Sequence, residues 1–167
     1  LYLSSDLYQI ASSGHSNGYI KTVGSSTYST HASNVDSNAV NGASDAMLAY
    51  AWAEVDGYSK FGIYEGNNSA DGTFVFTGFR PAWVFIKHID TSMSGVIVDI
   101  TRDPTNTLYN KILFPDSNTT ENTGANKYFD FVSNGFKLRG TSAAVNASAT
   151  YVYAAFAEQP FKYANAK

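Results

Sequence analysis

The chain has 167 residues, of which 44% are hydrophobic, 15% aromatic and 15% charged, and its formal net charge is −3. This apolar content can form the core of an ordinary domain, which argues against disorder, and the shortage of charged residues excludes a coiled coil. The acidic balance argues against a nucleic-acid binder, and the lack of cysteine excludes disulfides, zinc knuckles and thiol catalysis.

Short apolar or alternating runs, separated by Gly, Asn, Asp and Ser, predict β-strands along most of the chain. In chain order the expected strands are Leu1–Leu3, Tyr19–Val23, Asp45–Glu54, Phe61–Tyr64, Thr73–Thr77, Ala82–Ile89, Gly95–Thr101, Lys111–Phe114, Tyr128–Val132, Gly135–Leu138 and Thr150–Glu158. No segment is persuasive as a helix, and no apolar run approaches the roughly 20 residues that span a bilayer, so no membrane insertion is expected. Many short strands with turns between them predict an all-β fold, an antiparallel β-sandwich or jelly roll.

An internal repeat predicts how the chain is divided. Val40–Glu54 and Val145–Glu158 both begin with Val-Asn, continue through small residues and an apolar strand, and end on Ala, an aromatic residue, Ala and Glu. We therefore expect residues 1–57 to be the C-terminal part of a first β-sandwich unit and residues 58–167 to be a complete second unit. Tandem β units of this size are typical of extended fibres and adhesive stalks.

Several longer stretches carry a family resemblance. Glu54–Gly62, Thr77–Val84, Ser133–Arg139 and the ending Tyr153–Lys167 resemble recurrent stretches of tailed-phage virion structural proteins, many of them from marine viruses. The resemblance implies a concanavalin-like or lectin-like sandwich in a large repetitive virion protein, located at the virion surface or outside the cell. It also implies a homo-oligomer, a trimer or higher, that contacts itself and neighbouring repeats. It supplies no catalytic residue.

These observations predict a non-enzymatic structural and adhesive module of a phage fibre or appendage, which displays loops for contact with the host surface. Three alternatives stay open. The chain could be a strict lectin domain that recognises a host glycan, a depolymerase or glycosidase, or the building block of an extracellular filament. A lectin predicts a shallow pocket with an aromatic ring beside polar side chains, whereas an enzyme predicts carboxylates that converge in a cleft.

The candidate ligand-binding residues are Asn106, Tyr109 and Asn110, in the polar loop Thr105–Asn110, and Asp103 just before it. Amide side chains bind sugar hydroxyls, and an aromatic ring at the rim of a site stacks on the CH groups of a pyranose. Three other aromatic residues are further candidates for stacking: Trp83, which its continuous apolar run places in the core, Phe114 and Tyr128.

No catalytic residue is expected. Glu54 and Glu158 could form a glycosidase pair only at a separation of about 5–10 Å, but they hold equivalent positions in the two repeats, which favours a structural role. His15, His31 and His88 are isolated in the sequence, and no Gly-x-Ser-x-Gly nucleophile motif occurs.

No metal or cofactor is expected either. Asp99, Asp103 and Asp116 could bind calcium together with loop carbonyls, but the chain lacks the dense Asp, Asn and Gly spacing of a dedicated calcium loop. Asp99 is instead expected to pair with Arg102 or Arg80.

Overall fold

The computed structural model describes residues 20–23, 25–30, 50–102, 111–123, 126 and 128–159. The chain divides into two compact units, one of Ile10–Trp52 and one that joins Leu1–Gln9 to Ala53–Lys167. The described residues form strands joined by turns and irregular segments, with one 3-10 helix among them, η3 (Ile100–Arg102). Within these residues, no helix is long and apolar enough to cross a membrane.

The unit Ile10–Trp52 contains an antiparallel hairpin of β1 (Ile20–Val23) and β2 (Tyr28–Thr30), in which Val23 pairs with Tyr28. The first strand was expected from the sequence and the second was not, because residues 28–30 carry a single aromatic side chain among hydroxyl residues.

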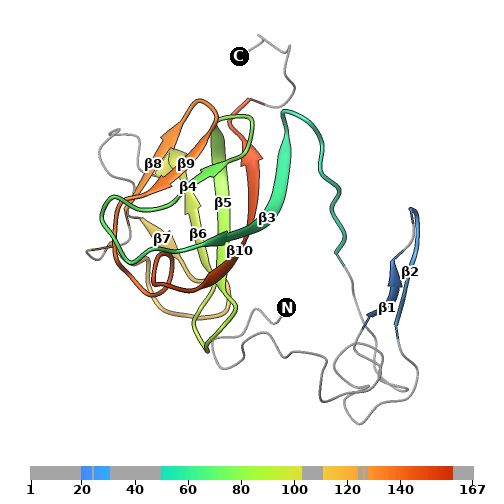
Figure 1. The fold of residues 1–167 in the computed structure, drawn as a ribbon, viewed down its shortest axis with the longest axis horizontal. Coiled ribbons are helices and arrows are strands. Elements are labelled where there is room, and N and C mark those ends of the chain that lie inside the picture. Colours follow the sequence, from blue (N-terminus) through green and yellow to red (C-terminus); the bar gives the residue numbers. More distant parts are fainter. Residues whose placement is uncertain are drawn as a thin grey trace. The chain divides into compact units, whose positions relative to one another are not determined.

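The larger unit contains two antiparallel sheets (Figure 1). The five-stranded sheet has the order β3 (Ser59–Glu65), β10 (Thr150–Ala157), β5 (Pro81–His88), β6 (Val96–Asp99), β7 (Ile112–Leu113). The three-stranded sheet has the order β4 (Phe74–Phe76), β9 (Gly135–Leu138), β8 (Phe129–Val132). The last of the described strands, β10, therefore lies inside the sheet, next to the edge strand, because it pairs with β3 on one side and with β5 on the other.

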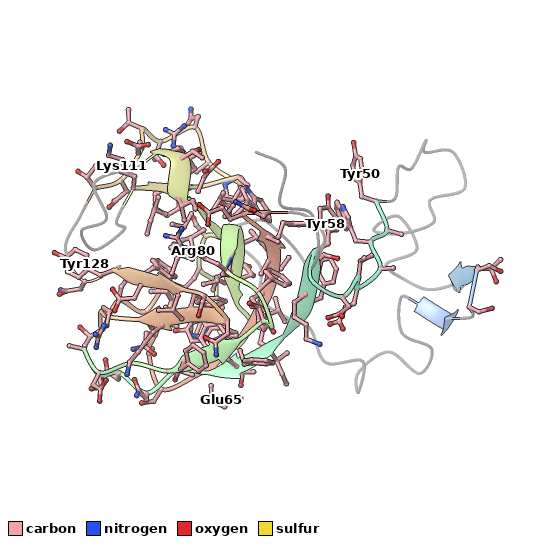
Figure 2. All side chains as sticks on the ribbon, turned by 90° about the horizontal axis from the view of Figure 1, so that it is seen from above. Tyr50, Tyr58, Glu65, Arg80, Lys111 and Tyr128 are labelled. Carbon is pink, nitrogen blue, oxygen red and sulfur yellow. The ribbon has the colours of Figure 1, made fainter. Side chains whose placement is uncertain are left out.

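Side chains that alternate along the strands form the core between the two sheets. In β10, Tyr151, Tyr153 and Ala155 are buried while the residues between them are half-buried. Phe136 of β9 packs edge-on against Tyr153, with ring centroids 5.7 Å apart, and this contact links the two sheets. Figure 2 shows side chains filling the larger unit. The all-β, antiparallel arrangement is consistent with a β-sandwich.

The strands expected from Phe61 onward are confirmed to within a few residues; β5, for example, begins at Pro81, one residue before the expected start at Ala82. The expected strand Asp45–Glu54 is wrong over residues 50–54, which join no ladder. A strand needs a neighbour for its main-chain groups, and those residues are instead exposed. The rest of that strand and Leu1–Leu3 lie outside the described residues.

Candidate functional site

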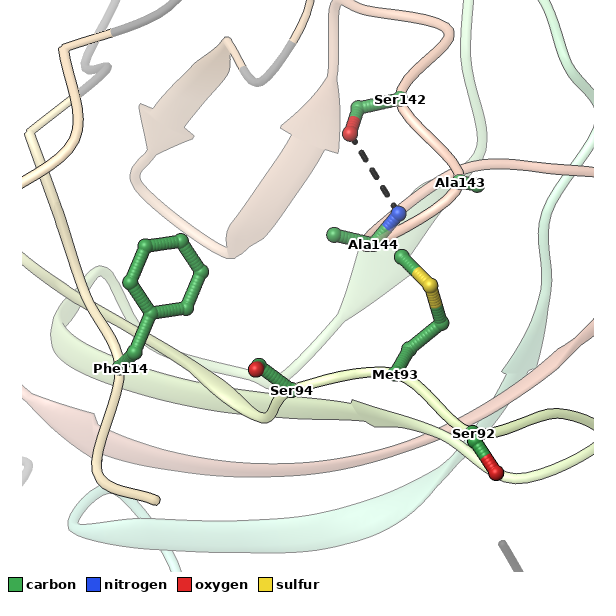
Figure 3. Close-up of a pocket in the computed structure, with 7 residues that line it drawn as sticks. All are labelled: Ser92, Met93, Ser94, Phe114, Ser142, Ala143 and Ala144. Carbon is green, nitrogen blue, oxygen red and sulfur yellow. Dashed lines mark hydrogen bonds between the residues drawn. The ribbon is translucent and has the colours of Figure 1, made fainter. Parts of the chain in front are cut away.

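A pocket of about 460 Å³ opens on the surface of the larger unit, where three turns meet (Figure 3). The first turn follows β5, the second follows β7, and the third precedes β10. The lining residues are Ser92, Met93, Ser94, Phe114, Ser142, Ala143 and Ala144. The three turns are far apart in the sequence, so the pocket exists only once both sheets have formed.

The first turn is held from beneath by a buried lysine. Lys87 is fully buried at the end of β5, and its ammonium donates a hydrogen bond to the carbonyl of Met93. Burial lowers the pKa of Lys87, and the nearby carboxylate of Asp116 opposes that shift. The same carboxylate accepts a hydrogen bond from the N–H of Gly95 through Oδ2, at 3.4 Å. The buried Lys87 and the half-buried Asp116 thus fix the backbone that presents Ser92 and Ser94.

The third turn is fixed by a buried amide and a buried phenol. Asn146 is fully buried, and its N–H donates to the carbonyl of Ser142 at 2.8 Å. The hydroxyl of Tyr151 donates to the carbonyl of Ala143 and accepts from the N–H of Ala147, both at 2.8 Å. Burial raises the pKa of Tyr151 to about 12, so its hydroxyl keeps the proton that it donates.

The second turn supplies the aromatic side chain of the pocket. Phe114 is half-buried and packs against the core, and its carbonyl accepts the N–H of Ser117 at 3.3 Å. Asp116 lies within this turn, and its Oδ1 is buried without a hydrogen-bond partner in the described part of the chain. A buried acceptor of this kind commonly binds water or a ligand donor.

The chemistry of the lining favours a neutral ligand rich in hydroxyl groups. No lining residue is charged, three are serines, and Phe114 and Met93 are the large apolar side chains. Serine hydroxyls both donate and accept hydrogen bonds, and an aromatic face accommodates CH groups. Turns that are fixed from beneath also lose little conformational entropy when a ligand binds.

The sequence predicted one member of this pocket, Phe114. The candidate ligand residues Asp103, Asn106, Tyr109 and Asn110 lie outside the described residues, so they stay a prediction. The other lining residues were missed because serine and alanine in turns carry no distinctive sequence signal.

The two other aromatic candidates lie elsewhere. Tyr128 is half-buried just before β8 and does not line the pocket. Trp83 does not lie in the core as expected. It is half-buried and points to the side of β5 opposite the buried Val84, because neighbouring residues of a strand face opposite sides of a sheet.

The two glutamates considered as a catalytic pair are each bound to a cation. Glu54 accepts a hydrogen bond from the ammonium of Lys60 at 2.9 Å, and this contact lowers the pKa of Glu54. Glu158 accepts one from the guanidinium of Arg80 at 2.7 Å. Neither carboxylate is presented to the pocket, so the geometry gives no support to an acid and base pair.

The expected partner of Asp99 is wrong. Asp99 accepts hydrogen bonds from the N–H and the hydroxyl of Thr101, at 2.9 and 2.6 Å, at the start of η3. Arg102 pairs with Glu121 and Arg80 pairs with Glu158. Asp99 therefore binds the backbone and hydroxyl of a residue two positions along the chain, a local contact that competes with pairing to an arginine.

Over the described ranges, no group of three or more histidine or acidic side chains is placed to hold a metal ion. His88 binds neighbouring backbone instead, because its Nδ1 accepts hydrogen bonds from the N–H groups of Asp90 and Thr91 at 3.1 and 3.3 Å. Burial lowers the pKa of His88, which keeps that nitrogen able to accept.

The fold and the pocket define an all-β protein with a neutral surface pocket, and comparison with known proteins places it in a family. Residues 5–160 match the model of a domain of unknown function, DUF7483, and the chain belongs to that family. No significant match was found among curated proteins or among solved structures.

Proposed function

We propose that the chain is a non-enzymatic structural and adhesive module of a phage virion fibre or appendage, and that its pocket binds a neutral surface glycan of the host. The proposed glycan binding rests on the pocket, where three fixed turns bring Phe114 beside serine hydroxyls. None of the residues that line the pocket is charged. The virion part rests on the resemblance of Glu54–Gly62 and of the other matching stretches to phage structural proteins.

The proposal includes a concanavalin-like sandwich and a tandem arrangement of units, for which the repeated Val-Asn and Ala-aromatic-Ala-Glu sequences are the support. It also includes a homo-oligomer at the virion surface. A single shallow pocket binds a sugar weakly, and several pockets displayed together bind a cell surface strongly because each further contact becomes intramolecular.

The carboxylates support a binding module over an enzyme. Glu54 and Glu158 are engaged in separate ion pairs, and Asp71 and Asp130 pair with Lys137 and Arg139. A glycosidase needs two carboxyl groups that face one substrate, with one of them free to act as an acid.

Glycan binding is tested with the full chain on arrays of neutral oligosaccharides and on polysaccharide extracted from bacterial surfaces. Phe114→Ala should weaken saturable binding about tenfold, since a stacked aromatic ring contributes roughly 0.5–1.5 kcal/mol beyond its buried area. Ser94→Trp should abolish binding by filling the pocket. Phe76→Ala is the matched control, because Phe76 is an exposed aromatic residue on β4 that does not line the pocket.

Saturable binding that both pocket variants lose and the control keeps would support the adhesive proposal. Binding that Phe114→Ala leaves unchanged would place the ligand elsewhere on the chain. A folded oligomer that binds no glycan would favour the alternative of a structural spacer or filament block.

A further inference from the structure

The loop between β5 and β6, residues 89–95, is held near its start by an imidazole. His88 is buried at the last position of β5, and its Nδ1 accepts the N–H groups of Asp90 and Thr91 at 3.1 and 3.3 Å. A ring nitrogen accepts hydrogen bonds only when it carries no proton, so the proton of the neutral ring lies on Nε2. One nitrogen therefore fixes two successive amides of the loop, and it does so only in the neutral form of the ring.

The same imidazole contacts the side chain that supports a second turn. His88 and Tyr151 are partners in the register of β5 and β10, and their rings meet edge to face with centroids 4.8 Å apart. The hydroxyl of Tyr151 holds the turn before β10 through the backbone of Ala143 and Ala147. Residues 140–149 of that turn contain no charged side chain. His88 thus links two of the three turns that line the pocket (Figure 3).

The titratable groups around His88 oppose one another. Burial is the main cause that lowers the pKa of His88; the carboxylate of Asp90 acts against it, and the positive charge of Lys87 adds to it. The group that faces the ring from β10 is the phenol of Tyr151, which is neutral because burial raises its pKa to about 12. Asp116, in the turn after β7, acts on Lys87. The ring of His88 is therefore neutral at pH 7.

The two ends of the loop differ in what holds them. At the far end, the ammonium of Lys87 bonds the carbonyl of Met93, and the N–H of Gly95 bonds Asp116, so the backbone from residue 93 to residue 95 has anchors that do not involve the imidazole. At the near end, residues 90–92 are exposed and depend on the nitrogen of His88 and on one exposed bond between the Asp90 carboxylate and the backbone of β10. The near end is thus the part that a change at His88 can release.

We propose that protonation of His88 releases residues 90–92 and opens the side of the pocket that Ser92 forms, which makes this loop a pH-sensitive device. A proton on Nδ1 turns the acceptor into a donor that faces two N–H groups, and it places a positive charge in a buried site beside Lys87. Outward movement of the ring relieves both, and the two amides that it held lose their acceptor. Ser92 lines the pocket and follows them directly in the chain.

The release does not depend on glycan binding, because it can be measured without a ligand. For the proposed glycan binding its consequence is a lower affinity at acid pH. The two ideas fail separately: a chain that binds no glycan at pH 7.5 contradicts the proposed function, whereas a loop that stays closed at pH 5 contradicts the device.

The test is amide hydrogen exchange of the full chain, followed by NMR at pH 7.5 and 5 and corrected for the intrinsic exchange rate at each pH. The equilibrium for opening at the amides of Asp90 and Thr91 should rise about 5- to 30-fold at pH 5. The upper value is that of a released histidine with a pKa of about 6.5, since each pH unit below that value contributes up to a factor of ten. Asn68 supplies the matched amide: its N–H bonds the carbonyl of Asn146 at 2.8 Å in a loop without histidine, and its opening should change less than about twofold.

Variants separate His88 from the other titratable groups. His88→Asn keeps an acceptor oxygen at the position of Nδ1 but cannot be protonated, so the pH dependence of opening should disappear. Replacing the other two histidines, with His15→Gln and His31→Gln together, should leave that dependence unchanged. A further readout needs no variant at residue 88: the methyl signal of Met93, one of two methionines, should change with the same midpoint as the ring signals of His88.

Opening that follows the titration of His88 and that His88→Asn abolishes supports the proposal. Three results overturn it. Protection of Asp90 and Thr91 that is equal at the two pH values would show that the loop stays closed. An equal loss of protection at Asn68 would show a general loosening of the fold. A pH dependence that persists in His88→Asn, or a Met93 signal that does not follow the His88 ring, would assign the effect to the carboxylates.

Discussion

Asn146 offers the sharpest test of how the larger unit is held together. Its Oδ1 accepts the N–H of Asn67 at 3.1 Å, and its Nδ2 lies 3.1 Å from Oδ1 of Asn67, 2.9 Å from the carbonyl of Ser69 and 2.8 Å from the carbonyl of Gly140. One buried amide therefore ties the turn after β3 to the turn before β10. Asn146→Ala removes all of these contacts and leaves a small cavity.

The expected loss of stability follows from the number of hydrogen bonds that the side-chain amide of Asn146 can make. One acceptor oxygen and two hydrogens give three full hydrogen bonds, each with a net value of about 1 kcal/mol. Asn67 and Ser69 lie near the surface and can bond to water in the variant, whereas the bond to Gly140 is buried. Leaving that carbonyl without a partner adds about 1 kcal/mol, so we expect a loss of about 4 kcal/mol in the free energy of unfolding. This corresponds to a decrease in Tm of roughly 10 °C for a chain of this size.

The assay is urea unfolding followed by far-UV circular dichroism. Asn118→Ala is the control, because Asn118 is an exposed asparagine in a loop and should change stability by less than about 0.5 kcal/mol. A loss below about 1 kcal/mol for Asn146→Ala would refute the reasoning, since it would mean that water replaces the amide at no cost. Asn146→Asp should be worse than Asn146→Ala at pH 7, because a carboxylate cannot donate to the two carbonyls and carries a buried charge.

Three further predictions concern pH, backbone packing and surface charge. Burial lowers the pKa of His88 below its ordinary value of about 6.5. Just below pH 6.5 the unfolded chain therefore binds more protons than the folded chain does. The contribution of His88 to stability is complete above that pH and is lost as the pH falls through the folded-state pKa. Urea midpoints at pH 7.5 and 5 measure this, and the effect should be smaller in His88→Gln; an equal pH dependence in both proteins contradicts it. Gly66→Ala should lower the free energy of unfolding by about 2 kcal/mol or more, because the added Cβ would lie 2.0 Å from the carbonyl oxygen of Ala147. Urea unfolding measures the change. A loss below about 0.5 kcal/mol would show that the backbone moves away without cost. Glu158→Gln should lower the free energy of unfolding by less than about 1 kcal/mol, because the ion pair between Glu158 and Arg80 is exposed to solvent. High salt should make this loss smaller still. A loss above about 2 kcal/mol at high salt would be inconsistent with a screened surface contact.

The strands from Phe61 onward were predictable because side-chain alternation and turn residues are local signals. Asp45–Glu54 reads as a strand by the same signals, yet residues 50–54 join no ladder, because a strand forms only where a neighbour is present to pair with it. The prediction that Trp83 lies in the core, made from the continuous apolar run around it, was also wrong. A run without alternation predicts burial on both faces, whereas Trp83 is half-buried on a face that no described strand of the second sheet covers.

The pocket was less predictable than the fold. Phe114 was recognisable as a candidate ring, but Ser94 and Ala143 reach it through strand pairings that connect distant parts of the chain. The sequence shows Asn146 as part of a repeated Val-Asn pair, but nothing in the sequence predicts that its side-chain amide is buried. Lys87 ends an apolar strand, and charge alone predicts exposure for it, whereas its carbonyl partner in the following turn allows complete burial.

The position of β10 between β3 and β5 sets the order in which this protein can fold during synthesis. β3 and β5 leave the ribosome early, but neither has its shared neighbour until the strand ending at Ala157 emerges. Until then each presents an unpaired edge, which other chains can capture. Closure of the sheet joins residues that are up to 97 positions apart, as Ser59 and Phe156 are, so folding is expected to be slow and dominated by non-local contacts. A C-terminal truncation that ends before Thr150 thus removes β10 and separates β3 from β5, β6 and β7.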